Sequence, residues 1–173
     1  MTDSKIPDGA GRTPRFRSVL LVCAANTARS VMAEHLILRE LRARGAGHLV
    51  QVRSAGIAAY ARDGALVSLD TRMALREAGI AVDDELTSND LKRHPEMIAE
   101  ADLILAMAEA HAAAVHKTFA DLPLPRMERF KNFASEPGDI EDPMQQGHEA
   151  FAHCRDEIMR LVPRVVDRLL SEN

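Results

Sequence analysis

Residues 18–30 read Ser-Val-Leu-Leu-Val-Cys-Ala-Ala-Asn-Thr-Ala-Arg-Ser, and this stretch decides the fold. The apolar run over residues 18–23 is typical of a buried parallel strand. A polar turn over residues 24–28 follows. Residues 29–44 then place four apolar side chains at helical spacing: Ala33, Leu36, Ile37 and Leu41. A strand, a short turn and a helix in this order indicate the first unit of an α/β fold.

The rest of the chain continues the alternation. Strands are predicted over residues 50–54, 101–107 and 123–129, and helices over residues 70–78, 109–119 and 149–170. Pro163 lies inside the last helix, so we expect it to kink or split that helix. Strands that alternate with helices predict a single α/β domain, with a parallel sheet covered by helices on both faces.

Composition narrows the class of protein. The 173 residues fit one domain, and the net charge of −4 gives no reason to expect a nucleic-acid surface. No stretch is long and apolar enough to span a membrane. Residues 1–16 are polar and rich in Gly, Pro and charge, without the apolar stretch of a secretory signal. We interpret them as a mobile N-terminal arm before a domain over residues 17–173, and we expect a cytoplasmic protein.

The turn after the first strand has the features of an anion site. Ligands bind at the carboxyl ends of strands in open α/β sheets, and the N-terminus of the next helix offers free backbone N–H groups. Such a loop suits phosphate. Its small residues allow a close approach, and Asn26 tolerates a left-handed conformation. The predicted phosphate-binding residues are Ala24, Ala25, Asn26, Thr27, Ala28, Arg29 and Ser30.

Cys23 stands at the start of this loop, where its thiolate is a candidate nucleophile. The helix end and Arg29 favour the thiolate form. Arg29 also offers a planar fork of donors to two phosphoryl oxygens. Ser30 can donate its hydroxyl to the sulfur when the sulfur becomes a leaving group. Taken alone, Cys23 would be an ordinary buried cysteine at a strand end; the Arg-Ser pair and the helix behind it favour catalysis.

The pattern Cys-x-x-Asn-x-x-Arg-Ser at the end of a first strand resembles the active-site loop of the low-molecular-weight protein tyrosine phosphatases. The stretches Arg53-Ser54-Ala55-Gly56, 101–107 and Asp139-Ile140-Glu141-Asp142-Pro143 resemble later parts of the same family. The resemblance covers most of the chain after residue 16. It implies a four-stranded parallel sheet flanked by helices on both faces and hydrolysis through a phosphocysteine on Cys23, without a metal or other cofactor.

A leaving oxygen needs a proton, and a carboxylic acid near the phosphate loop can supply it and later activate water. Asp142 is the candidate, because Pro143 stiffens its loop and the resemblance assigns it this role. The plain alternative is a solvated turn residue. Asp139 is a second candidate. The resemblance also implies a hydrogen bond between Ser54 and the phosphate loop, although an ordinary strand-end serine fits the sequence nearly as well.

Three residues are expected to shape the substrate pocket: Thr27, Tyr60 and Met144. Tyrosine-specific members of the family usually carry an apolar branched residue at the position of Thr27, whereas the bacterial protein-arginine phosphatases have Thr there. An aromatic residue usually follows Asp-Pro; here it is Met144, which weakens stacking on a phenyl ring. Tyr60 is either a pocket wall or a surface tyrosine. Phosphotyrosine in a protein substrate is the leading prediction, with phosphoarginine as the alternative.

Two further departures affect the phosphate loop. Ala25 replaces the usual Gly and is expected to crowd the loop. Ala28 stands where many members carry a second cysteine, so Cys23 lacks that protective partner, and we expect its oxidation to be less easily reversed. Arsenate reduction needs such relay cysteines, and none lies between residues 24 and 153. A non-catalytic phosphate-binding regulator remains a lesser alternative.

Overall fold

The computed structural model describes residues 13–172 of the chain. Residues 1–12, which make up most of the expected N-terminal arm, lie outside the described residues. No helix among the described residues is sufficiently long and apolar to cross a lipid bilayer.

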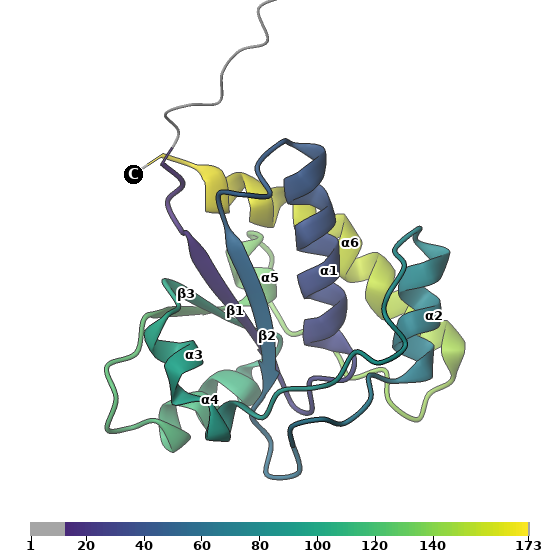
Figure 1. The fold of residues 1–173 in the computed structure, drawn as a ribbon, viewed down its shortest axis with the longest axis horizontal. Coiled ribbons are helices and arrows are strands. Elements are labelled where there is room, and N and C mark those ends of the chain that lie inside the picture. The colour runs from purple at the N-terminus through teal and green to yellow at the C-terminus, as the bar shows by residue number, and fades with distance from the viewer. Residues whose placement is uncertain (1–12, 173) are drawn as a thin grey trace, which may run out of the picture.

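Four strands form one sheet in the spatial order β2-β1-β3-β4: β1 (Ser18–Cys23), β2 (Gln51–Gly56), β3 (Leu103–Ala106) and β4 (Arg126–Arg129). All three neighbouring pairs are parallel. Their carboxyl ends therefore meet at one edge of the sheet, at the bottom of Figure 1. The prediction of a four-stranded parallel sheet is confirmed.

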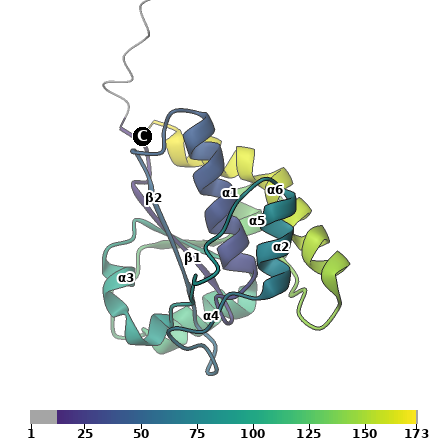
Figure 2. The same cartoon turned by 45° about the vertical axis from the view of Figure 1, so that its right-hand side comes forward.

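Helices cover both faces of this sheet (Figures 1 and 2). One face carries four helices: α1 (Arg29–Ala43), α2 (Leu69–Glu77), α5 (Phe130–Phe133) and α6 (His148–Leu170). The other face carries α3 (Pro95–Ala99) and α4 (Glu109–Thr118), with a 3₁₀ turn over Leu91–Arg93 before them. The short helices α3 and α5 and the 3₁₀ turn were not predicted, because segments of three to five residues carry too little periodicity.

The central strand β1 explains why both faces need covering. Val19, Leu21 and Cys23 belong to the core beneath α1 and α6, whereas Leu20 and Val22 belong to the core beneath α3 and α4. Successive side chains of a strand point to opposite faces, so an apolar strand of this kind is stable only between two layers of helices. Burial on both sides fixes the position of Cys23 at the carboxyl edge.

The last helix differs from its prediction. Helix α6 runs unbroken from His148 to Leu170 with Pro163 inside it, so the expected split is wrong. Pro163 is exposed, whereas Val162 and Val165 on the inner face are buried. Proline removes one backbone hydrogen bond, but burial of the apolar face against α1 stabilises the remaining turns.

The start of the chain also differs. Phe16 was assigned to the mobile arm, but it is buried and packs edge to face on Phe133 at 5.9 Å between ring centroids. The backbone N–H groups of Arg15 and Phe16 donate to the carbonyls of Ser171 and Leu169. Burial of a phenylalanine side chain contributes about 2 kcal/mol, which is enough to hold this segment in place. The folded part therefore begins before residue 17.

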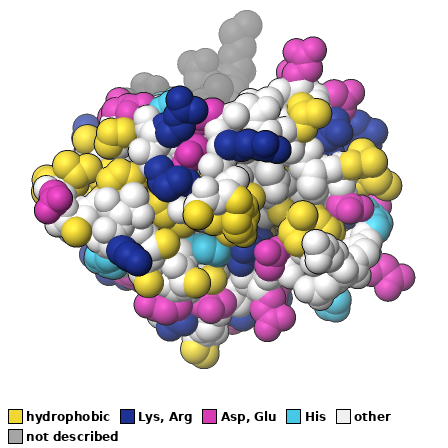
Figure 3. Space-filling view, turned by 90° about the horizontal axis from the view of Figure 1, so that it is seen from below, with side chains coloured by type: hydrophobic (Ala, Val, Ile, Leu, Met, Phe, Trp, Pro, Cys, Tyr) yellow, Lys and Arg dark blue, Asp and Glu magenta, His cyan; other side chains and the backbone are white. Residues whose placement is uncertain are grey.

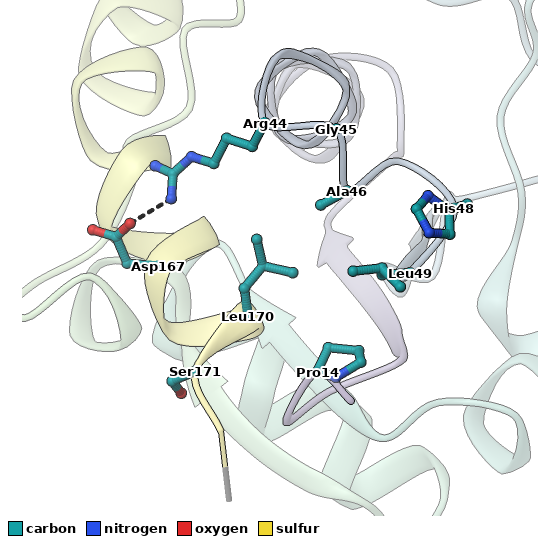
Figure 4. A pocket seen from close by; sticks show the side chains of 9 residues that line it. All are labelled: Pro14, Arg44, Gly45, Ala46, His48, Leu49, Asp167, Leu170 and Ser171. Atoms are coloured by element: carbon teal, nitrogen blue, oxygen red, sulfur yellow. Dashed lines mark hydrogen bonds and ion pairs between the residues drawn. The ribbon is translucent and has the colours of Figure 1, made fainter. Parts of the chain in front are cut away.

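A hollow of about 410 Å³ lies at the opposite edge, where the strands begin (Figure 4). Pro14, Leu49 and Leu170 form its apolar lining. Arg44 crosses it and pairs with Asp167, as the dashed line in Figure 4 marks. This hollow joins the C-terminal ends of α1 and α6 and is remote from the carboxyl ends of the strands.

Candidate active site

The phosphate loop connects β1 to α1. Strand β1 ends at Cys23, which pairs with Gly56 of β2, and the helix begins at Arg29. A Cβ atom on Gly56 would lie 2.7 Å from the carbonyl oxygen of Ala24 and 2.8 Å from the carbonyl carbon of Ala25. Only glycine leaves room for this approach. The Ser-Ala-Gly stretch of β2 thus provides the floor on which the loop rests.

Asn26 determines the curl of this loop. Its φ of 60° lies in the left-handed region, as the sequence predicts for an asparagine at this place. The side-chain amide donates to Ser30 Oγ and to Ser54 Oγ, both at 2.9 Å, and its oxygen accepts from the backbone N–H of Asn89 at 2.9 Å. Asn26 is buried, so these bonds are shielded from water. They hold the loop in one shape before any substrate arrives.

Glu34 completes this buried network from the second turn of α1. Ser54 Oγ donates to Glu34 Oε2 at 2.5 Å. Burial raises the pKa of Glu34 above its ordinary value, and the hydrogen bond from Ser54 opposes that shift. The role implied for Ser54 by the family resemblance therefore has a geometric basis: Ser54 joins the phosphate loop to the neighbouring strand and helix.

In this conformation, most backbone N–H groups of the phosphate loop have no acceptor in the described part of the chain. Among residues 13–172, the amides of residues 24, 25 and 27–30 donate to no protein acceptor. The amide of Asn26 donates to Cys23 Sγ at 3.3 Å. These N–H groups belong to the loop whose Asn26 amide contacts the sulfur, and those of residues 29 and 30 form the N-terminus of α1. Free amides and a helix dipole at one point favour an anion with several oxygens, which is the property of a phosphoryl group.

Cys23 lies at the floor of this arrangement. It is 3% exposed, but it lines the pocket above it. Its Sγ lies 2.9 Å from Ser30 Oγ. The hydroxyl of Ser30 can donate to a thiolate there, which stabilises negative charge on sulfur. Ala25, which was expected to crowd the loop, does not have a positive φ, so its methyl group causes no backbone strain.

Arg29 is almost completely buried, and three groups orient its guanidinium. Nη1 donates to the carbonyl of Ile140 at 3.0 Å, Nη2 lies 3.4 Å from His111 Nε2, and Nη2 lies 3.6 Å from Asp142 Oδ2. The carbonyl and the imidazole fix the direction of the fork without neutralising its charge. A substrate phosphoryl group can therefore use that charge.

His111 is a contact that the sequence did not indicate. The sequence assigns it no role in the site, but it is 7% exposed and contacts Arg29. Burial, followed by the positive charge of Arg29, lowers its pKa from 6.5 to about 4. The ring is thus neutral at physiological pH, and its Nε2 can accept from Arg29. Its Nδ1 is buried without a partner among the described residues.

The acid loop brings Asp142 to the same place. The Asp142 side chain is 46% exposed and lines the pocket with Cys23 and Arg29. Asp139, the second candidate, is used elsewhere: its Oδ1 accepts from the backbone N–H of Glu109 and from Arg129. Asp139 thus stabilises the N-terminus of α4, and Asp142 is the carboxylate that faces the sulfur side of the pocket.

The resulting pocket has a volume of about 420 Å³. Of the residues predicted to shape it, Thr27, Tyr60 and Met144 all line it. Gln145 and Gln146 add polar groups that the sequence did not single out. The main chain of Thr27 is also anchored, because its carbonyl accepts from Ser68 N and Thr71 Oγ1. A polar mouth and a floor of amide donors fit a phosphorylated side chain.

Within residues 13–172, no three His, Cys, Asp or Glu side chains gather in a way that would hold a metal ion. Both cysteines are free; Cys154 is buried, and burial raises the pKa of its thiol to about 12. Its sulfur is therefore a poor nucleophile, and Cys23 alone combines a thiol with the donor-lined pocket.

Comparisons with known proteins agree with this geometry. A family model described as "Low molecular weight phosphotyrosine protein phosphatase" matches residues 18–173. A protein-arginine-phosphatase of Geobacillus stearothermophilus is 34% identical over 155 residues, covering 89% of this chain and 97% of the relative. The low molecular weight protein-tyrosine phosphatase A of Mycobacterium bovis is 29% identical over 162 residues, covering 90% and 94%.

A solved structure bears on the nucleophile. It is an arginine phosphatase whose active-site cysteine was replaced by serine and which carries a phosphorylated active site serine. It superposes with a TM-score of 0.78 at 27% identity, covering 90% of this chain and 97% of its own. The strand-loop-helix unit around Cys23, the parallel sheet and the match over almost the whole domain lead to one conclusion. This chain belongs to the low-molecular-weight phosphotyrosine protein phosphatase family.

Proposed function

We propose that this protein hydrolyses phosphorylated side chains of proteins through a phosphocysteine on Cys23, with Asp142 as general acid and base. The observation that carries the proposal is that Cys23 Sγ accepts the Asn26 amide in a loop whose other amides have no protein acceptor among the described residues, and that Cys23 shares a pocket with Arg29 and Asp142. A sulfur anion at this point faces a phosphorus atom whose oxygens the loop binds. The loop stabilises charge on those oxygens as the transferring group becomes planar.

In the first step, the electron pair of the Cys23 thiolate forms the S–P bond while the bond from phosphorus to the leaving atom breaks. Arg29 binds two equatorial oxygens with its two Nη groups, in place of its 3.6 Å contact with Asp142. Asp142, released and protonated, gives its proton to the leaving oxygen or nitrogen. The products are phosphocysteine and a dephosphorylated side chain.

In the second step, water attacks phosphorus on the side that the leaving group has vacated. The Asp142 carboxylate accepts a proton from this water, the S–P bond breaks, and its electron pair returns to sulfur. Ser30 Oγ, 2.9 Å from Sγ, donates a hydrogen bond to the departing thiolate. Inorganic phosphate leaves, and the enzyme regains a thiolate at Cys23 and a proton on Asp142.

Phosphotyrosine is the first proposed substrate. Tyr60 and Met144 line the mouth and offer apolar contacts to a phenyl ring. A reducing cytoplasm, in which Cys23 stays a free thiol, is the proposed location, and phosphorylated proteins are the proposed partners.

Phosphoarginine is the second proposed substrate, and Thr27 is the observation that favours it. Thr27 lines the pocket together with Gln145 and Gln146, so the lining offers polar groups to a bound side chain. Such groups can hydrogen-bond a guanidinium, whereas a phenyl ring gains nothing from them. The 34% identical relative from Geobacillus stearothermophilus is an arginine phosphatase, which supports the same candidate.

The mechanism is tested by trapping the covalent intermediate. In Cys23→Ser, a serine that accepts the phosphoryl group is a poor leaving group, so intact-mass spectrometry after incubation with an aryl phosphate should show one added phosphoryl group. Cys154→Ser, which changes the buried second cysteine, should turn over the same substrate like the wild type. Full activity of Cys23→Ser would refute the proposal.

The substrate is tested by comparing the kcat/KM of two peptides that share a sequence and differ only in phosphotyrosine or phosphoarginine. The measurement is repeated with Thr27→Ile. If Thr27 selects the guanidinium, this variant loses phosphoarginine turnover and gains on phosphotyrosine. An unchanged ratio would show that Thr27 does not select the substrate.

A further inference from the structure

Exposed apolar side chains gather beside the pocket. Six large apolar residues are exposed in the described part of the chain. Three of them line the pocket or the groove next to it: Tyr60, Leu66 and Met144. Figure 3 views the end at which the strands finish and shows apolar side chains between charges of both signs. Single exposed apolar residues are ordinary, but a group next to a binding site indicates contact with a partner.

A groove joins this apolar group to the pocket. Thr27 and Met144 line both the pocket and the groove, so the two are continuous. The groove continues past Leu66 and Ser68 toward the first turn of α2, where Leu69 is exposed. It is wide and shallow, unlike the deep pocket for the phosphoryl group. A chain whose modified side chain enters the pocket thus has a second surface immediately beside it.

Hydrogen bonds hold the backbone under this groove in place. Ser88 Oγ donates to the carbonyl of Arg62 at 2.7 Å and accepts from the N–H of Ala65 at 3.2 Å. The backbones of Ser88 and Ala65 are also bonded, at 2.8 Å. The Asp63 carboxylate accepts from the N–H of Asp90 at 2.7 Å. A surface held in this way loses little conformational entropy when a partner binds.

The two charged side chains of the groove differ in whether they already have a partner. Asp63 pairs with His94 at 2.9 Å, and its hydrogen bond from Asp90 lowers its pKa, so this carboxylate is already engaged. Arg62 lines the groove, is exposed, and has no ion pair with any of residues 13–172. A carboxylate on the partner is the group that Arg62 lacks.

We propose that this groove, between Leu66, Arg62 and Met144, docks the segment of the substrate protein that flanks its phosphorylated residue. The preferred segment has a large apolar side chain that packs on Leu66 and Met144 and an acidic residue that pairs with Arg62. This inference rests on the proposed phosphatase function and adds a rule for choosing substrates. Two residues of an extended chain span about 7 Å, so the docked side chains belong to the residues nearest the phosphorylated one.

The test uses two substrates of different size. An aryl phosphate fills the pocket alone, whereas a phosphopeptide with Leu and Glu beside the phosphorylated residue also reaches the groove. The variant Leu66→Ser is compared with Leu122→Ser, because Leu122 is also an exposed leucine, at 41% against 62% for Leu66, but lines a different pocket, beside Pro123. Arg62→Gln tests the acidic contact with peptides that carry Glu or Gln.

Leu66→Ser should raise the KM of the peptide about fivefold and leave its kcat unchanged, because partial burial of one leucine contributes this much to binding. The aryl phosphate should be hydrolysed at the wild-type rate, and Leu122→Ser should behave as the wild type on both substrates. Arg62→Gln should remove the preference for Glu over Gln.

Two results would overturn the inference while the phosphatase function stands. One is equal turnover of apolar and polar peptides by the wild type; the other is a Leu66→Ser variant that is dimer-deficient but unchanged on peptides, which would mark the groove as a contact between two copies. Sedimentation of wild type and variant distinguishes that case. Failure of the wild type to hydrolyse the aryl phosphate would instead refute the phosphatase function itself.

Discussion

The two ends of helix α1 lie at two hollows of nearly equal volume, about 420 Å³ at its N-terminus and about 410 Å³ at its C-terminus. At the N-terminus, the amides of residues 27–30 have no protein acceptor among the described residues. At the C-terminus, the last carbonyls are satisfied, because Leu41 and Arg42 accept from Ala46 and Gly45. The volume of a hollow therefore does not distinguish the candidate site. Backbone N–H groups without a protein acceptor do distinguish it.

Charge follows the same division. Arg44, at the C-terminal hollow, pairs with Glu40 and Asp167 and donates to the carbonyl of Pro163. Arg29, at the N-terminal pocket, contacts a carbonyl, a neutral imidazole and one carboxylate 3.6 Å away. One arginine is neutralised by its own chain, whereas the other keeps its charge for a ligand.

The largest expected difference comes from changing each arginine to lysine. Arg29→Lys keeps the charge but loses the planar fork, so kcat on an aryl phosphate should fall about 10³-fold. Arg44→Lys should retain wild-type activity. Steady-state kinetics of both variants measure this, and equal activities would contradict the division between the two ends of α1.

Asp142→Ala tests the carboxylate that lines the N-terminal pocket beside Arg29. Loss of the general acid should lower kcat about 10²-fold for substrates with poor leaving groups. Substrates with acidic phenols need less protonation and should lose much less. A rate loss that does not depend on the leaving group would contradict the role of Asp142 as acid.

Substitutions of Asn26 test whether the free backbone N–H groups of the phosphate loop depend on the left-handed conformation at this position. Asn26→Gly keeps the left-handed conformation but leaves buried partners unpaired, which should lower the free energy of unfolding by about 1–3 kcal/mol. Asn26→Ala adds a conformational strain of about 1 kcal/mol. Urea unfolding and kcat/KM report both losses. If Ala and Gly are equivalent, the left-handed φ is not what matters.

Protonation of His111, which contacts Arg29, makes the stability of the protein depend on pH. Its pKa of about 4 in the folded protein lies below the ordinary 6.5, so the unfolded chain binds the proton more tightly. The His111 contribution to stability is therefore complete above pH 6.5 and is lost as pH falls toward 4, by at most about 3 kcal/mol. The variant His111→Gln should show a shallower loss over this interval in urea unfolding.

His94 and His148 act in the opposite sense over the same interval. Hydrogen bonds that His94 and His148 donate to Glu96 and Glu77, respectively, raise their pKa values, so these pairs gain stability as the histidines become protonated. The contribution of His111 is therefore obtained from the difference in the free energy of unfolding between the wild type and His111→Gln at each pH. Parallel pH profiles for the two proteins would contradict the assignment.

The smallest effect is expected at the C-terminal hollow. Asp167→Ala removes one partner of Arg44, but the Asp167 side chain is exposed and Glu40 remains. The free energy of unfolding should change by at most about 1 kcal/mol, and catalysis should not change. A loss of activity in this variant would show that the two ends of α1 are coupled.

The sequence predicts the elements whose signals are local. The apolar run to Cys23, the turn and the periodic residues of α1 lie within one stretch, and the structure places them as expected. The expected place of Phe16 and the expected split at Pro163 are wrong, because the burial that decides each comes from distant residues. Pattern gives local preference, and tertiary packing overrides it.

The contacts of the site show the same limit. Asp142 could be named because it precedes Pro143 in a stretch that resembles the family. His111 and Asn89 could not, because each meets the loop only through the folded sheet, 82 and 63 residues from its partner. Their residue types carry no signal for that contact.

The pairing of residues 15 and 16 with residues 169 and 171 has a consequence for synthesis on the ribosome. The phosphate loop emerges early, but the acid loop and the helix that packs over α1 follow more than a hundred residues later. Until then, the apolar face of the central strand β1 that α6 helps to cover remains exposed. The contacts that orient Arg29 and cover α1 are therefore complete only after the acid loop and the final helix have been made.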